Sequence, residues 1–173
     1  MEKNLVFVDA ETDGLYGGFL TVAMIATDRD GQDLERTYLG IRKENMKITS
    51  SWVEENVLPR LGEYEVCEDE KELLERTWEF WLRYADTSYA VCDVGYPVEA
   101  RLFRKCVELN PEANTFLAPF PLLDISSLLL AKGYDPLMSR AEFLGEQADS
   151  RQHNALYDAE VSVRVWKKLR IKE

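Results

Sequence analysis

The sequence predicts an α/β domain of three layers, in which helices cover both faces of a mixed β-sheet. Two features carry this prediction. Apolar runs around an Asp-Gly turn indicate a hairpin near the start of the chain, and strand-like runs then alternate with helical patterns. The 173 residues, 46% of them hydrophobic, suffice for a sizeable core. We therefore expect a single domain over residues 1–173.

Short apolar runs predict the five strands of this sheet. Asn4–Asp9 is rich in Val and Phe, as buried strands are. Leu20–Thr27 and Asp33–Leu39 flank the sequence DRDGQD, whose Asp-Gly pair favours a hairpin turn. Ser88–Asp93 is the fourth strand. The run FPLLD, just before a helical pattern, contains a short fifth strand.

Helical periodicity and capping residues predict the helices. Apolar residues recur every three or four positions over Lys71–Tyr84. Pro97 lies in the first turn of the next helix, where a missing N–H costs no hydrogen bond. The expected helices are Ser51–Leu61, Lys71–Tyr84, a helix with Pro97 in its first turn, a helix from Asp124 closed by Gly133, and Asn154–Arg170.

Composition limits the classes of partner. A net charge of −11 repels a polyanion at long range, so a nucleic acid must be met locally by metal ions, backbone amides or a small basic patch. The acidic surface serves solubility equally well. No apolar run approaches the ~20 residues of a membrane span, and the acidic start is unlike a secretory signal. The cysteines, odd in number and without metal-ligand spacing, predict reduced thiols in a cytoplasmic protein.

Asp9 and Glu11 form the first candidate metal-binding pair. Side chains alternate along a strand, so both carboxylates point to the same face. Like charges at this range raise a pKa unless a cation lies between them, and Mg²⁺ or Mn²⁺ prefers such oxygen ligands. A solvated acidic loop after the strand is the alternative interpretation.

The last helix carries the second pair. With Asn154 as its cap, Asp158 lies one turn into the helix, in line with the apolar positions Val161, Val165 and Leu169. A carboxylate on a buried face needs a partner or a metal, although an acid near a helix start also interacts with the helix dipole. His153, the only histidine, precedes the cap and can turn toward whatever Asp158 binds. Its imidazole suits proton transfer at neutral pH.

Asp93 and Glu99 lie where the fourth strand passes into a helix. Both carboxylates could reach a site at the carboxyl end of the strand. Either one could bind a metal while the other only caps the helix.

Together these segments resemble the DEDDh branch of the 3′–5′ exonucleases, on a ribonuclease H-like fold. That family includes proofreading subunits of DNA polymerases, ribonuclease T and oligoribonuclease. The first motif resembles VDAETDG, with Asp9 and Glu11, and the third resembles HNALYDA, with His153 and Asp158 five residues apart. The second motif departs from the pattern of Asn, two residues, then Asp. Asp93 stands in the place of the Asn, and Glu99 in that of the Asp after a longer turn.

The resemblance implies metal-assisted phosphodiester hydrolysis with two Mg²⁺ or Mn²⁺ ions roughly 3.5–4 Å apart. Asp9 would bridge the ions, Glu11 would help to hold one, and Asp158 would complete the water-activating site with His153 as general base. Asp93 or Glu99 would supply the second-motif ligand. The substrates would be 3′ ends of RNA or single-stranded DNA, with an exoribonuclease preferred, and the products nucleoside 5′-monophosphates.

Residues in the first motif and just beyond it are candidates for substrate binding. Thr12 and Gly14 lie in the motif, and Gly14 lets the chain turn. Leu15 and Tyr16 could stack on the terminal base or simply pack within the loop. Arg101, after the second motif, fits a solvated helix face better than a phosphate contact.

Two other functions stay open. A catalytically inactive interaction or nucleic-acid-binding module would have lost its chemistry at the unusual second motif. A phosphohydrolase acting on free nucleotides would suit the acidic surface. Relatives often dimerise, so a homodimer is a candidate assembly, and no membrane association is expected.

Overall fold

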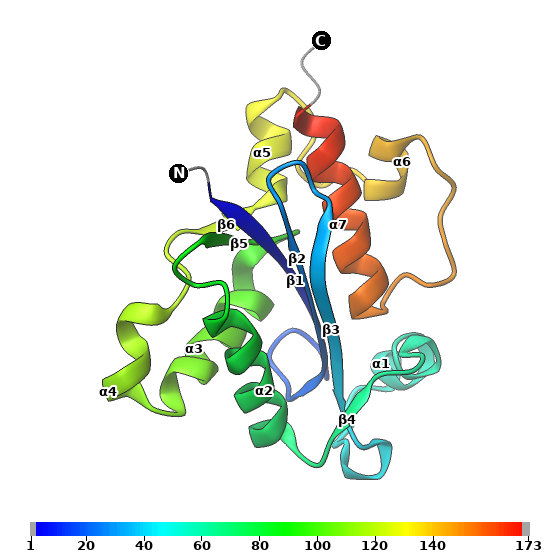
Figure 1. The fold of residues 1–173 in the computed structure, drawn as a ribbon. Helices are drawn as coiled ribbons and strands as arrows, with labels where there is room; N and C mark the ends of the chain where they lie inside the picture. The colour runs from blue at the N-terminus through cyan, green and yellow to red at the C-terminus, as the bar shows by residue number, and fades with distance from the viewer. Residues whose placement is uncertain (1–2, 171–173) are drawn as a thin grey trace.

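The computed structural model describes residues 3–170, and its centre is a mixed six-stranded sheet in the order β4-β3-β2-β1-β5-β6 (Figure 1). β1 pairs antiparallel with β2 and parallel with β5, so it lies inside the sheet. The strands are β1 (Asn4–Thr12), β2 (Phe19–Thr27), β3 (Asp33–Ile41), β4 (Glu65–Cys67), β5 (Ser88–Cys92) and β6 (Leu122–Asp124). The predicted hairpin-first mixed sheet is confirmed.

The predicted count of five strands is wrong by one, because β4 lies at the edge of the sheet. β4 has three residues and pairs parallel with the end of β3. Only Cys67 in it is buried, whereas Glu65 and Val66 are exposed. A strand with one buried side chain has no apolar run or alternation to reveal it.

The helices follow the predicted order with shifted ends and two additions. Their bounds are α1 (Ser51–Asn56), α2 (Glu70–Leu82), α3 (Ala100–Glu108), α4 (Pro111–Asn114), α5 (Ile125–Ala131), α6 (Arg140–Leu144) and α7 (Ala155–Arg170). The helix expected over Ser51–Leu61 is split because Pro59 cannot donate a backbone hydrogen bond, and a 3-10 turn follows α1. Pro97 lies in a separate turn, Gly95–Glu99, because Tyr96 has an extended backbone. The short helices α4 and α6 were not predicted.

The two faces of β1 contact different helices. Val6, Val8 and Ala10 pack with residues of α2 and α3 in one core, whereas Leu5 and Phe7 pack with residues of α5, α6 and α7 in another. Figure 1 shows α7 on one side of the sheet and α2 and α3 on the other. The odd-numbered face of β1, which continues to Asp9 and Glu11, is therefore the face that α7 covers. Among residues 3–170, no helix is long and apolar enough to cross a bilayer.

Phe7 joins β1 to α7, and its truncation tests this layer. The buried ring packs edge-to-face on Trp166, with the ring centroids 6.2 Å apart. We expect Phe7→Ala to lower the free energy of unfolding by about 3–5 kcal/mol in urea titrations, because it leaves a cavity. Leu34→Ala, at a side chain 53% exposed on β3, is the control and should change it by less than about 0.5 kcal/mol. Similar losses in both variants would contradict the assigned packing.

Candidate metal centre and active site

Asp9 and Glu11 project from the carboxyl end of β1 toward the side of the sheet that carries α7. They pair with Ala23 and Thr21 of β2, and a register shift follows directly after Glu11. Both carboxylates lie on one face, as strand alternation predicts, and both are partly buried. The buried strand thus ends in two carboxylates that water solvates poorly.

The start of α7 brings Asp158 to the same place. The Asn154 side chain accepts a hydrogen bond from the Tyr157 N–H at 3.0 Å, so Asn154 caps the helix as predicted. The Asn154 amide also donates to the carbonyl oxygens of Arg60 and Leu61, at 2.9 and 2.8 Å. These contacts fix where α7 begins and so where Asp158 lies.

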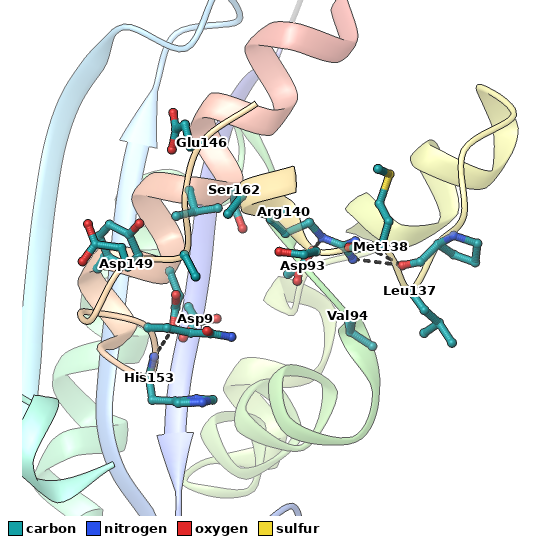
Figure 2. Close-up of a pocket in the computed structure, with 18 residues that line it drawn as sticks. Asp9, Asp93, Val94, Leu137, Met138, Arg140, Glu146, Asp149, His153 and Ser162 are labelled. Atoms are coloured by element: carbon teal, nitrogen blue, oxygen red, sulfur yellow. Dashed lines mark hydrogen bonds and ion pairs between the residues drawn. The ribbon is translucent and has the colours of Figure 1, made fainter. Parts of the chain in front are cut away.

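His153 stands just before this cap in a left-handed backbone conformation, with φ of 70°. Its backbone N–H donates to Asp158 Oδ2 at 2.9 Å. Ligand atoms of Glu11, His153 and Asp158 all lie within 4.8 Å of one another. The sole histidine therefore converges with an acid of β1 and an acid of α7. Figure 2 shows His153 and Asp9 among the residues that line one pocket.

Crowding and burial disfavour the charged forms of these acids. Burial, with repulsion from Asp158, raises the pKa of Glu11 to about 8. Burial also raises the pKa of Asp158 to about 7, although the hydrogen bond from His153 lowers it. The pKa of Asp9 lies well above its usual value through burial and repulsion from four neighbouring carboxylates, Glu99 first among them. Hard oxygen donors that repel one another in this way fit a divalent cation.

The two candidates of the second motif have different surroundings. Asp93 Oδ1 accepts a hydrogen bond from Arg140 Nε at 2.6 Å, in an ion pair drawn in Figure 2. Glu99 is only 6% exposed, and burial raises its pKa to about 8, with repulsion from Asp93 and Glu11 contributing. Arg140 thus supplies a countercharge to Asp93, although burial still raises the pKa of that carboxyl. Glu99 has no cationic partner among the described residues, and its carboxylate accepts backbone hydrogen bonds from Glu99 and Ala10.

Among the candidate substrate-binding residues, Thr12 is buried, whereas Gly14, Leu15 and Tyr16 are exposed. Thr12 Oγ1 donates to the Gly14 carbonyl at 2.6 Å, and Gly14 has a φ of 70° that suits glycine, so these two shape the turn after β1. Leu15 and Tyr16 are 61% and 69% exposed and could touch a ligand. The predicted solvated helix face is wrong for Arg101, which is partly buried. Its guanidinium is also not free to bind a phosphate. It donates to the Gly17 carbonyl at 2.6 Å and holds this loop.

A cavity of about 400 Å³ opens beside the acids (Figure 2). Asp9, Asp158 and His153 line one side, and the loop and start of α6, from Pro136 to Ala141, line another. Arg140 closes this second side by donating to the carbonyl oxygens of Pro136 and Met138 as well as to Asp93. The cavity gives a small ligand access to the acidic cluster.

Sequence reasoning missed three residues of this region. Arg140 pairs with Asp93, Asp13 binds the start of α1, and Trp52 of α1 contacts the His153 ring. Asp13 follows the first motif closely, which was a usable signal. Nothing in the sequence pattern around Arg140 or Trp52 indicates a contact with a residue so distant along the chain.

No protein-family model matches the sequence, and no curated protein matches it. Solved structures do match. Escherichia coli exonuclease I, in a zinc-bound complex with single-stranded DNA, superposes with a TM-score of 0.71 at 11% identity, over 96% of this chain and 40% of that one. Exonuclease I from Methylocaldum szegediense gives a TM-score of 0.71 at 18% identity, over 98% and 41%.

An exonuclease X complex with 5′ overhanging duplex DNA gives a TM-score of 0.58 at 17% identity, over 95% of this chain and 90% of that one. The chain thus spans about 40% of the length of the exonuclease I chains but most of exonuclease X. At these identities the likeness concerns the fold. That fold, a mixed sheet with helices on both faces, is the one seen in exonuclease I and exonuclease X, as the predicted fold class led us to expect.

Proposed function

We propose that this protein is a divalent-metal-dependent 3′–5′ exonuclease that releases nucleoside 5′-monophosphates from single-stranded ends. The observation that carries the proposal is the convergence of Glu11, His153 and Asp158 within 4.8 Å, next to Asp9. The exonuclease fold supports it independently.

The carboxylates of Asp9, Glu11 and Asp158 would hold the cations, with Glu99 as the fourth acid. We prefer Glu99 to Asp93 because Arg140 already supplies a countercharge to Asp93. When bound, Mg²⁺ or Mn²⁺, two ions per site, supplies charge neutralisation for a phosphodiester under attack.

His153 would act as the general base. Burial and the nearby positive charge of Arg60 lower its pKa, so the imidazole is neutral at physiological pH. A neutral imidazole can take a proton from the oxygen of an attacking water. Leu15 and Tyr16, exposed at the turn after β1, would stack on the terminal base, with Thr12 and Gly14 shaping the turn.

RNA is the preferred substrate from the sequence resemblance, whereas exonuclease I of E. coli was crystallised with single-stranded DNA. RNA and DNA oligonucleotides of identical sequence, compared under the same conditions, decide between them. A nucleoside triphosphate in the same assay tests the phosphohydrolase alternative. An inactive module is less well supported, because Glu99, in the place of the second motif's Asp, is near enough to Asp9 for its charge to raise the pKa of that carboxyl.

His153→Ala tests the general base. We expect turnover of a labelled oligonucleotide to fall by about 10²–10⁴-fold, because the attacking water loses its proton acceptor. Oligonucleotide binding and stabilisation by Mn²⁺ should persist. Turnover equal to that of the wild type would remove His153 from the mechanism.

Glu99→Gln and Asp93→Asn form a matched pair of neutral amides. At a Mn²⁺ concentration 100 times its Kd, the wild type should gain about 2.7 kcal/mol of stability, measured by thermal unfolding. Glu99→Gln should lose most of this gain. Asp93→Asn should keep it, although the metal-free protein loses about 1–3 kcal/mol when Arg140 loses its negatively charged partner. The reverse pattern would assign the second-motif ligand to Asp93.

Stability of the metal-free protein should depend on pH. The pKa of Glu11 is 4.5 without the fold and about 8 within it, so the unfolded chain releases its proton first as pH rises. The melting temperature should therefore fall between about pH 4.5 and about pH 8, and Mn²⁺ should raise it more at the upper end. Glu11→Gln should flatten the dependence. An equal Mn²⁺ effect across this range would contradict the proposed ligands.

A further inference from the structure

Trp52, on the short helix α1, contacts the imidazole of His153. The ring centroids lie 5.1 Å apart at an interplanar angle of 82°, an edge-to-face arrangement. Within residues 3–170, hydrogen bonding at His153 is confined to its backbone, and no hydrogen bond orients the ring. The indole is thus a group from another element that limits where the imidazole can turn.

Asp13 fixes the helix that carries Trp52. Its carboxylate is buried, with the residue 8% exposed, and accepts hydrogen bonds from the Thr49 N–H at 2.8 Å, the Thr49 hydroxyl at 2.6 Å and the Ser50 N–H at 3.0 Å. The Ser50 side chain in turn caps α1. Asp13 directly follows β1, so the segment just beyond the strand that carries the acids holds the start of α1.

These contacts form one continuous connection from the end of β1 to the histidine. Asp13 holds Thr49 and Ser50, α1 carries Trp52, and Trp52 abuts the ring of His153. We infer that Asp13 and Trp52 are positioning residues that hold the imidazole of His153 over Glu11 and Asp158. The inference rests on the proposed function, and it gives both residues a role beyond packing.

Positioning of this kind has a large effect on rate. A displacement of about 1 Å can cost roughly 100-fold in turnover when a proton must pass between two oriented groups. His153 lies outside α7, so packing within that helix does not fix its ring. The contact with Trp52 comes from another element and can hold the ring in place.

Trp52 is 53% exposed, which suits a second role that the experiment must separate. An exposed indole can also stack on a nucleobase. Stacking would act on substrate affinity and would not depend on His153. Positioning would act on turnover and only through His153.

A double-mutant cycle separates the two roles. We expect Trp52→Ala to lower kcat roughly 10- to 100-fold with little change in KM. Trp52→Phe, which keeps an aromatic face, should restore most of the activity. In a His153→Ala background, Trp52→Ala should have no further effect. A raised KM that persists in that background would overturn the inference and make Trp52 a substrate contact.

The single histidine gives a readout that needs no activity. At about pH 8.5 the imidazole is neutral, and its proton signals in an NMR spectrum report the ring current of Trp52. Trp52→Ala should move these signals toward those of free histidine. Asp13→Asn and Thr49→Val should move them in the same direction, although neither residue is in ring contact with His153. Unmoved signals in the Trp52 and Asp13 variants would overturn the inference.

Asp28→Asn is the matched control for Asp13→Asn. Asp28 also accepts backbone hydrogen bonds, from Asp30 at 2.9 Å and Gln32 at 2.8 Å. It follows Thr27, which pairs with Leu5 at the opposite end of β1 from Glu11. This variant should leave kcat and the imidazole signals unchanged. An inactive wild-type protein would refute the proposed function alone, because the NMR comparison would still test the positioning.

Discussion

Repulsion among carboxylates at the end of a buried strand is the constraint on which this site depends. Asp9 experiences the charges of Glu99, Asp158, Glu11 and Asp93, and burial weakens the solvation of each group. Arg140 supplies a countercharge to Asp93, but none of the ion pairs within residues 3–170 involves the other four acids. Burying unpaired carboxylates costs free energy, and the fold does so here while it pairs charges elsewhere on its surface. Such a group of carboxylates is suited to divalent cations.

The sheet and its helices bring this repulsion about. Alternation along β1 directs even-numbered residues to α2 and α3 and odd-numbered ones to α7, so Asp9 and Glu11 meet the helix that carries Asp158. Asn154 caps that helix and ties its start to the carbonyl oxygens of Arg60 and Leu61. The layer that buries Phe7 therefore also sets the separation of the acids.

Features that depend on local periodicity could be predicted from the sequence. The shared face of Asp9 and Glu11 follows from strand alternation, and the Asn154 cap follows from residue type and spacing. Contacts that depend on the path of the chain could not be predicted. The proposed preference for Glu99 over Asp93 depends on Arg140, which lies 47 residues from Asp93 and has no signal in its own segment. The edge strand β4 is too short, and too exposed, to leave a pattern.

The central claim is that acids from three segments share divalent cations. A crystal of the protein soaked in Mn²⁺ together with a nucleoside monophosphate tests it most directly, because anomalous scattering locates manganese without reference to activity. We predict anomalous peaks at about 2.0–2.6 Å from carboxylate oxygens of Asp9, Glu11 and Asp158, with Glu99 adjoining them. A crystal with no peak among these carboxylates, or with manganese held only by surface acids, would contradict the account.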